Sequence, residues 1–197
     1  MDENREMRVG LRARRLPRRA GWLLASLLAA GCGHAPPPLA AVREVDLDRF
    51  MGRWYVIASI PTFIERGAHD AVESYRLAAD GSIETTFTFR DGGFEGEAKR
   101  YTPRGYVVDR VSNAVWGMQF VWPVKAEYRI AYLAPDYSQT VIGREKRDYM
   151  WIMARTPRIP DEDYDRLVRF VAAQGYDVSK IRRVPQRDRA APTEGRS

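Results

Sequence analysis

The stretch Gly52-Arg53-Trp54-Tyr55 begins the first run of residues with β-strand character, and Arg147-Asp148-Tyr149-Met150-Trp151-Ile152-Met153-Ala154-Arg155 ends the last such run. A tryptophan at the start of a first strand and an arginine at the end of a last strand can seal one end of a closed β-barrel. The guanidinium then lies over the indole face in a cation–π contact of roughly 0.5–2 kcal/mol. We therefore predict that Trp54 and Arg155 close one end of a barrel.

Three further motifs stand between and after these two segments: Glu65-Arg66-Gly67, Ala134-Pro135-Asp136-Tyr137 and Gly175-Tyr176-Asp177-Val178-Ser179-Lys180. In order and spacing, the set from about Phe50 to about Pro185 resembles the lipocalins, and specifically the bacterial outer-membrane lipocalins. The resemblance implies a lipid-binding barrel with a role in membrane biogenesis, repair or stress. The chain departs from the family pattern at 105–109, which is awkward to align with the fourth and fifth strands.

The first 31 residues have the layout of an export signal, with a basic start followed by an apolar run, Ala20 to Ala30, that is too short to span a bilayer. The run ends at Ala29-Ala30-Gly31-Cys32, which looks like a bacterial lipoprotein signal. Lipoprotein signals prefer Leu three residues before the cysteine, where this chain has Ala29. Cleavage before Cys32 would leave a lipidated N-terminus. Gly33 stands where an Asp would resemble an inner-membrane retention signal, so the outer membrane is favoured.

Cys32 is the single cysteine of the chain, so no intramolecular disulfide can form. Lipidation would give this single thiol a function, because two or three acyl chains anchor a protein stably in a membrane. The alternative is that Cys32 is an incidental residue of a signal peptide that is removed whole. The domain organisation that we expect is a signal peptide (1–31), a lipidated tether (32–45), a barrel (46–185) and a disordered polar tail (186–197).

The basic character of the chain belongs largely to the signal. Seven of the 32 basic and three of the 26 acidic residues precede residue 32, which leaves 25 and 23 and a net charge of +2. Basic residues elsewhere are interspersed with acids, so no nucleic-acid footprint is present.

Period-two alternation with turn signals dominates 46–185. The expected strands are 53–60, 71–78, 82–90, 94–101, 105–110, 114–121, 127–134, 138–144 and 148–155. We interpret 94–101 and 105–110 as one bent strand interrupted at Pro103, which leaves eight. The sequence therefore predicts an all-β fold, an eight-stranded antiparallel up-and-down barrel.

One segment, 160–174, has helical periodicity instead, because Tyr164, Leu167, Val168 and Val171 recur at i, i+3, i+4 and i+7. Acidic residues follow Pro160 in the first turn, and Gly175 can end the helix. We predict one C-terminal helix packed on the outside of the barrel.

An eight-stranded barrel has room inside for side chains or for one small ligand. Alternation within the strands, with polar residues placed outward, predicts an apolar and aromatic interior. The candidate ligand-binding residues are Val56, Ala58, Phe87, Phe89, Trp116, Met118, Tyr128, Ile130, Tyr149, Trp151 and Met153. The same alternation places Ile83, Thr85, Phe120 and Tyr132 inward. Each of these side chains could equally be core filler, and a slip of one residue would reverse a strand.

Signals for catalysis and metal binding are weak. The two histidines, His34 and His69, form no zinc motif, and no histidine is placed to activate a serine. We expect no enzyme activity, no metal and no cofactor. Glu65-Arg66-Gly67 is interpreted as a structural feature of the first loop, with a lipid-phosphate contact through Arg66 as the alternative. Trp122-Pro123 could belong to the barrel mouth, to a membrane contact or to a dimer contact.

These observations favour a lipid-anchored carrier on the periplasmic face of the bacterial outer membrane. It would bind a fatty acid, a lysophospholipid or a similar amphiphile inside the barrel, and it could form a homodimer. Two alternatives stay open. One is a structural or assembly lipoprotein that docks on a membrane partner, and the other is a lipocalin-type enzyme that uses Tyr, Asp or Glu inside the barrel.

Overall fold

The computed structural model describes residues 37–187. The expected signal peptide, the lipidation site Cys32 and the tail beyond Arg187 lie outside the described residues. The larger strands are β1 Gly52–Ile60, β2 Ala68–Leu77, β3 Ile83–Asp91, β4 Glu97–Tyr101, β5 Arg104–Val107, β6 Val115–Val121, β7 Val124–Leu133, β8 Gln139–Gly143 and β9 Met150–Ala154.

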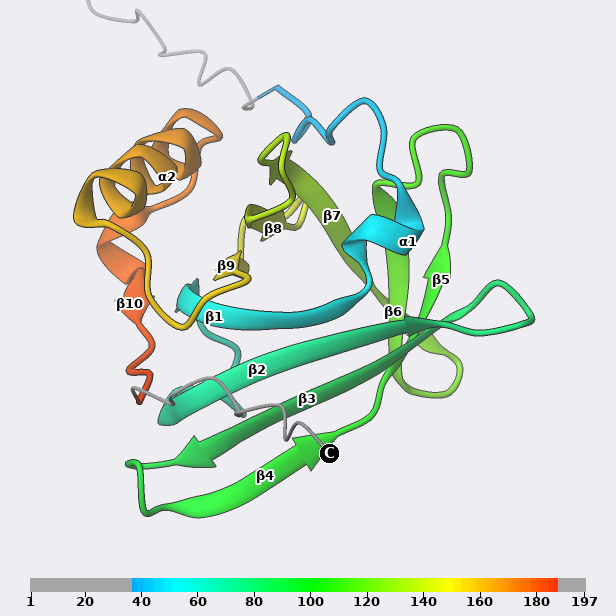
Figure 1. The fold of residues 1–197 in the computed structure, drawn as a ribbon. Coiled ribbons are helices and arrows are strands. Elements are labelled where there is room, and N and C mark those ends of the chain that lie inside the picture. The colour runs from blue at the N-terminus through cyan, green and yellow to red at the C-terminus, as the bar shows by residue number, and fades with distance from the viewer. Residues whose placement is uncertain (1–36, 188–197) are drawn as a thin grey trace, which may run out of the picture. The chain divides into compact units, whose positions relative to one another are not determined.

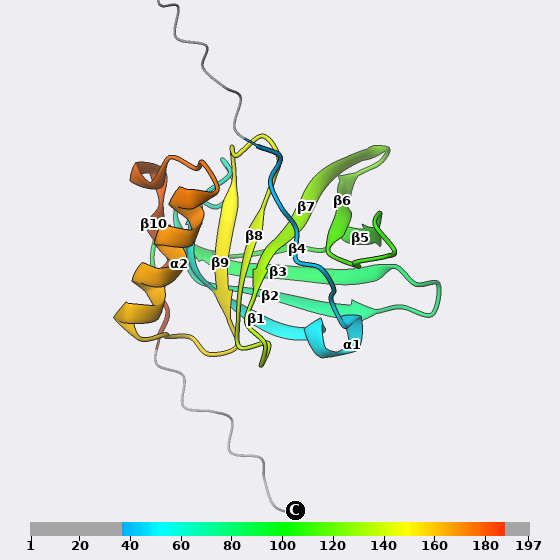
Figure 2. The ribbon, with the colours of Figure 1, turned by 90° about the horizontal axis from the view of Figure 1, so that it is seen from above.

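The strands form a closed ring. Each strand pairs antiparallel with its neighbours in the order β1-β2-β3-β5-β6-β7-β8-β9, and β9 pairs back onto β1 (Figures 1 and 2). β4 and β5 both pair with β3, β4 along 87–91 and β5 along 83–84. They occupy different lengths of one edge and therefore count as a single strand interrupted at Pro103. The predicted eight-stranded antiparallel barrel is confirmed.

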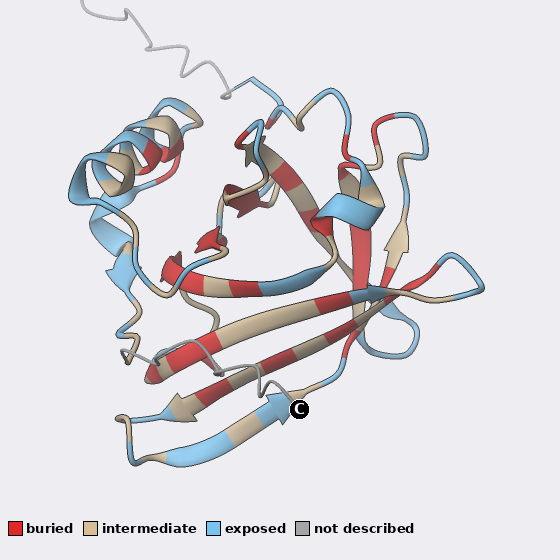
Figure 3. Ribbon diagram, viewed as in Figure 1, coloured by how far each residue is buried: buried red, intermediate tan, exposed pale blue. Residues whose placement is uncertain are grey.

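The helix α2, Asp161–Ala173, packs on the outside of the barrel (Figure 2). It has three acidic residues in its first turn and is followed by Gly175, whose positive φ of 85° suits a glycine at a helix end. One stripe of the helix is buried, and the opposite side is exposed (Figure 3). The predicted apolar face of α2 therefore lies against the barrel wall.

Between α2 and the wall lies a group of buried side chains that we call the outer cluster. Its members are Leu39, Ile57, Ala58, Ile60, Val141, Met150, Ile152, Ala154, Leu167, Val171 and Tyr176. Leu167 and Val171 of α2 are fully buried, and each such side chain contributes roughly 1.5–3 kcal/mol on removal from water. The outer cluster is therefore a main reason for the helix to dock.

The end of the barrel that carries the short helix α1, Leu47–Phe50, is sealed as predicted. The Arg155 guanidinium carbon lies 3.8 Å from the centroid of the Trp54 ring. The same guanidinium donates hydrogen bonds to the carbonyl oxygens of Arg49 (2.7 Å), Phe50 (3.1 Å) and Arg53 (2.9 Å). The Trp54 indole N–H donates to the Phe50 carbonyl at 2.9 Å. These contacts thus join the first strand, β1, and the end of the last barrel strand, β9, to α1.

Turns at this closed end are stabilised by aspartate side chains. Asp80 accepts hydrogen bonds from the backbone N–H and the hydroxyl of Ser82, and Asp136 accepts the same pair from Ser138. These hydrogen bonds lower the pKa of both carboxyls, because they favour the charged form. Each Asp-x-Ser segment is therefore a local turn signal that needs no tertiary partner.

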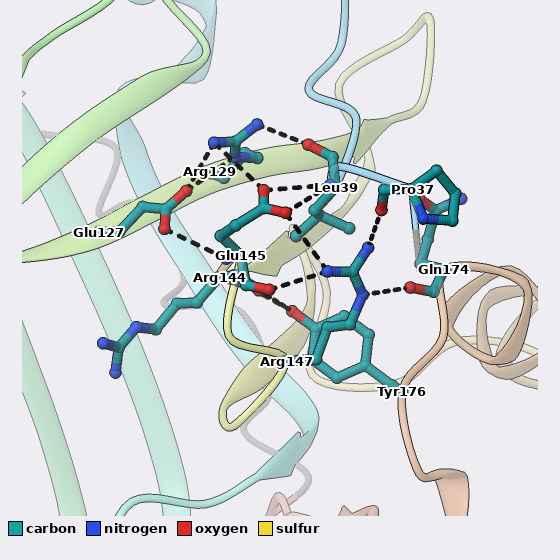
Figure 4. A network of polar contacts seen from close by, with 9 residues as sticks. All are labelled: Pro37, Leu39, Glu127, Arg129, Arg144, Glu145, Arg147, Gln174 and Tyr176. Carbon is teal, nitrogen blue, oxygen red and sulfur yellow. Dashed lines mark hydrogen bonds and ion pairs between the residues drawn. The ribbon is translucent and has the colours of Figure 1, made fainter. Parts of the chain in front are cut away.

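Residues 37–45, which the sequence analysis assigns to the tether, lie along the barrel wall. Leu39 is fully buried, its N–H donates to the Glu145 carboxylate (3.1 Å), and its carbonyl accepts from Arg129 (2.5 Å). Arg147 donates to the carbonyls of Pro37 (2.5 Å) and Gln174 (2.7 Å). Figure 4 shows this network joining the N-terminal segment, β7, the β8–β9 loop and the end of α2.

The C-terminal segment also packs on the strands. After the 3-10 helix η1 (Val178–Lys180), β10 (Arg182–Arg183) pairs with β1. The Gln186 side-chain amide donates to the carbonyls of Val56 (2.8 Å) and Ala71 (2.9 Å). The Arg187 N–H donates to Asp70 at 2.7 Å. The first two residues of the expected tail are thus bound to β1 and β2.

Candidate ligand-binding site

The barrel interior contains a second group of buried side chains, which we call the interior cluster. It comprises Val45, Phe50, Trp54, Val56, Ala68, Ala71, Tyr75, Ile83, Phe87, Phe89, Ala114, Trp116, Met118, Tyr128, Ile130, Ile142 and Met153. Of the eleven candidate ligand-binding residues, this cluster brings together Val56, Phe87, Phe89, Trp116, Met118, Tyr128, Ile130 and Met153. Trp151 packs against it and is half-buried.

The inward prediction for Ala58 is wrong, because Ala58 belongs to the outer cluster beneath α2. The register between β1 and β9 shifts between Val56 and Ala58, where Val56 pairs with Met153 and Ala58 pairs with Ile152. A β-bulge of this kind adds one residue and turns the rest of the strand over. Ser59, which pairs with Trp151, therefore takes the inward position that strict alternation gives to Ala58.

The same error affects Tyr132. The pairing of β7 with β8 shifts between Ile130 and Tyr132. As a result, Tyr132 faces α2, where its ring lies 5.5 Å from that of Phe170 and its hydroxyl accepts a hydrogen bond from Arg166 (2.8 Å). Sequence alternation cannot detect such a bulge, because it depends on the partner strand.

Two further candidates lie at the open end. Tyr149 precedes β9 in the β8–β9 loop, half-buried, with the Arg144 guanidinium 5.3 Å from its ring centroid. Phe120 lies near the tip of the β6–β7 hairpin and is 53% exposed. Neither side chain belongs to the interior cluster.

The closed half of the interior is filled by aromatic rings. The Trp116 ring lies 5.4 Å from Phe50, 5.7 Å from Tyr75 and 5.2 Å from Tyr128, measured between centroids. Phe50 in turn lies 5.0 Å from the Trp54 ring. Offset and edge-on pairs at these distances are favourable. Because these rings are buried by one another, they form the floor of the barrel interior.

The open half has a different lining. The rings of Phe87, Phe89 and Tyr101 contact one another along the inner faces of β3 and β4, with Tyr101 only half-buried. Lys99 pairs with Phe89 across the strands and so shares the inner face, with its ammonium 2.7 Å from the Glu97 carboxylate. Apolar walls with a cation near the mouth suit an acyl chain with an anionic head.

The interior also contains a carboxyl group that the sequence analysis missed. Glu73 pairs with Phe87, so it lies on the inner face of β2, and Tyr75 donates a hydrogen bond to it while contacting the Tyr128 hydroxyl. Burial, together with the charge of Glu65, raises the pKa of Glu73 to about 8. Burial likewise raises the pKa of Tyr128. The alternation of Glu73, Tyr75 and Leu77 against Ser74 and Arg76 is the signal that could have identified it.

The Glu65-Arg66-Gly67 motif shapes the mouth. The Glu65 carboxylate is buried and accepts from the Thr62 N–H (2.9 Å), the Thr62 hydroxyl (2.8 Å) and the Trp151 indole (3.1 Å). A Cβ at Gly67 would lie 2.5 Å from the Asp91 carboxylate, so a side chain there would collide. These contacts favour the structural interpretation of the motif, while Arg66 is exposed.

Two hollows are lined by residues that do not belong to the interior cluster. A groove of about 220 Å³ runs over the outward residues of β1 to β4, including Arg53, Ser74 and Arg100. A second, of about 350 Å³, lies at the strand break around Pro103 and borders Thr85. Within 37–187, no group of three or more His, Cys, Asp or Glu side chains could hold a metal ion. None of the described helices is long and apolar enough to span a membrane.

Comparison with solved structures identifies the class of barrel. Insecticyanin from the tobacco hornworm Manduca sexta superposes with a TM-score of 0.61 over 78% of this chain and 87% of that one, at 16% sequence identity. At this identity the likeness concerns the fold alone. The closed ring, the indole–guanidinium seal and the outer helix define a lipocalin-type barrel.

Sequence comparison then gives the family. A family model described as a lipocalin-like domain matches residues 45–186, and the chain belongs to that family. Temperature-induced lipocalin-1 of Arabidopsis thaliana is 35% identical over 156 residues, which cover 76% of this chain and 84% of the relative. Outer membrane lipoprotein Blc of Escherichia coli strain K12 is 28% identical over 162 residues, covering 80% and 89%.

Proposed function

We propose that this lipocalin is a non-enzymatic carrier that binds a single-chain amphiphile, a fatty acid or a lysophospholipid, in the open half of the barrel. The acyl chain lies against Phe87, Phe89 and Tyr101, and the head group stays at the mouth. Burial of apolar surface supplies the affinity, at roughly 25 cal/mol per Å² before ordering costs. Membership of the lipocalin-like family supports binding of a hydrophobic ligand.

The observation that carries the proposal is the contrast in burial along the interior. The floor rings Trp54 and Trp116 are fully buried, whereas Tyr101 and Trp151 keep exposed surface on the same lining. Accessible aromatic surface inside a barrel is surface that a ligand can cover. Lys99, on the inner face of β4, supplies a cation for a carboxylate or phosphate head.

A pair of substitutions on β4 tests this site. Tyr101→Glu places a charge on the lining, whereas Ala98→Glu places the same charge on the exposed outer side of the strand. Titration of the full-length chain with a fluorescent fatty acid should show affinity reduced by about tenfold or more for Tyr101→Glu, because a charge in an apolar site costs several kcal/mol. Ala98→Glu should bind as wild type. Equal affinities in all three proteins would exclude the interior as the site.

We further propose that the carrier is anchored by acyl chains on Cys32 to the periplasmic face of the bacterial outer membrane, for membrane maintenance. The signal-like sequence before Cys32 and the relatives named as outer membrane lipoproteins support this location. Labelled palmitate should enter the wild-type chain and not Cys32→Ser, and Cys32→Ser should leave the membrane fraction. Retention of the label in Cys32→Ser would contradict the anchor.

A second candidate function, docking on a membrane partner, is favoured by one feature. The tip of the β6–β7 hairpin exposes Phe120 (53%), Val121 (72%), Trp122 (82%) and Val124 (69%). Contiguous exposed apolar residues mark interaction surfaces. A partner that remains bound to Tyr101→Glu and is lost from Trp122→Ser in a membrane pull-down would favour docking over carriage.

A further inference from the structure

Two polar atoms on the inner face of the barrel lack a hydrogen-bond partner within residues 37–187. Glu73 accepts from the Tyr75 hydroxyl through Oε2, while no hydrogen bond or ion pair involves its Oε1. Thr85 is 4% exposed, and its buried hydroxyl has no partner. A buried hydroxyl without a hydrogen bond is costly, so an unpaired one calls for an explanation.

The strand register brings these two groups together. Tyr75 pairs with Thr85, and Glu73 pairs with Phe87, so Glu73 and Thr85 are diagonal neighbours on one face of the β2–β3 ladder. Diagonal neighbours lie about 7–8 Å apart, with their Cβ atoms somewhat closer, so one small group can reach both. That face is the interior, since Tyr75 and Phe87 belong to the interior cluster.

The charge around this pair restricts what it can bind. The groups that act on Glu73 are Glu65, Tyr75 and Tyr128, none of them cationic. An anion bound beside Glu73 would therefore lack a neutralising partner. A hydroxyl group suits both atoms, since it can donate to Glu73 Oε1 and accept from the Thr85 hydroxyl.

We propose that Glu73 and Thr85 form an internal polar subsite that binds a hydroxyl group at the inserted end of the ligand. The ligand class is then an amphiphile with an anionic head at the mouth and a hydroxyl at the far end of its chain, such as an ω-hydroxy fatty acid. The inference rests on the proposed carrier function and specifies the ligand of the same site.

Matched pairs of acids test the subsite. Dodecanoate and 12-hydroxydodecanoate differ only in the terminal hydroxyl, and octanoate with 8-hydroxyoctanoate and hexadecanoate with 16-hydroxyhexadecanoate extend the comparison in length. In an apolar barrel the hydroxyl weakens binding by about tenfold or more, because it is buried without a partner. The full-length wild-type chain should instead bind the hydroxy acid of at least one pair as tightly as its parent, or more tightly, in calorimetric titration.

Substitutions of Glu73 and Thr85 test whether these residues cause the preference for the hydroxy acid. Glu73→Leu should weaken the hydroxy acid by about tenfold relative to the parent acid, and Thr85→Val should act in the same direction with a smaller effect. Glu73→Gln retains a hydrogen-bonding oxygen and should keep the wild-type preference. Thermal unfolding of each variant, with parent-acid affinity as a second readout, separates lost binding from lost fold.

The titrations distinguish failure of the subsite from failure of the carrier function. Parent acids that bind while every hydroxy acid binds at least tenfold more weakly would overturn the subsite and leave the carrier intact. An unchanged preference in Glu73→Leu would also overturn it. Absence of binding by any acid would remove the carrier function itself.

Discussion

The outer and inner sides of the barrel wall differ in how they are covered. On the outer face, α2 and Leu39 complete an apolar cluster with side chains of the same chain. On the inner face, the rings of the floor are covered, but Trp151 and Tyr101 keep accessible surface, and Glu73 and Thr85 introduce polar groups. The outer cluster is thus a completed core, whereas the inner lining keeps accessible apolar surface and an unpaired Thr85 hydroxyl.

The largest expected effect is at the floor of the inner side. Trp54→Ala should lower the free energy of unfolding by about 3–5 kcal/mol, because it removes a fully buried ring and leaves the Arg155 guanidinium without its aromatic partner. Urea unfolding measures the loss. Arg53→Ala, one residue away and exposed, is the control and should change stability little.

A somewhat smaller effect is expected on the outer side. Leu167→Ala should lower the free energy of unfolding by about 2–5 kcal/mol through the cavity left under α2, with the exposed Arg169→Ala as control. Affinity for a fatty acid, measured below the unfolding transition, should stay within about twofold of wild type. A large change in affinity would mean that the two sides of the wall are coupled.

The pH dependence of stability tests the polar inner side. The pKa of Glu73 is raised from 4.5 to about 8 on folding, so the folded chain holds a proton that the unfolded chain has released. Its contribution to stability is therefore complete below pH 4.5, declines between pH 4.5 and 8, and is lost above that, with a slope of at most about 1.4 kcal/mol per pH unit.

Glu73→Gln should remove this decline, because an amide does not titrate in the window. Denaturant unfolding of both proteins at several pH values makes the comparison. Parallel profiles for the two proteins would show that Glu73 is charged and solvated in the native state.

The smallest effect is expected at the polar network of Figure 4, on the outer side. Arg147→Ala removes the hydrogen bonds to the carbonyls of Pro37 and Gln174 and should cost about 1 kcal/mol. Hydrogen exchange should increase in residues 37–45 and remain unchanged in the β2–β3 ladder. The neighbouring exposed residue provides the control, Lys146→Ala, which should exchange as wild type.

Local and periodic signals in the sequence were sufficient for the frame of the molecule. Alternation placed the strands to within a few residues, the helical spacing of Leu167 and Val171 identified α2, and the order of motifs paired Trp54 with Arg155. Each of these features can be recognised within a single strand, helix or sequence motif. Predicting them therefore did not require knowing which strands pair with one another.

Only the tertiary structure decided which side of the wall some residues face and what completes each cluster. The bulges that turn Ala58 and Tyr132 toward α2 exist only in the register between two strands. Likewise, Leu39 reaches the outer cluster from the N-terminal segment, and Glu73 meets Tyr128 from across the barrel. The periodicity of a strand is a property of its own sequence, whereas register and long-range contacts depend on every strand closing into one ring, so they appear only in the folded chain.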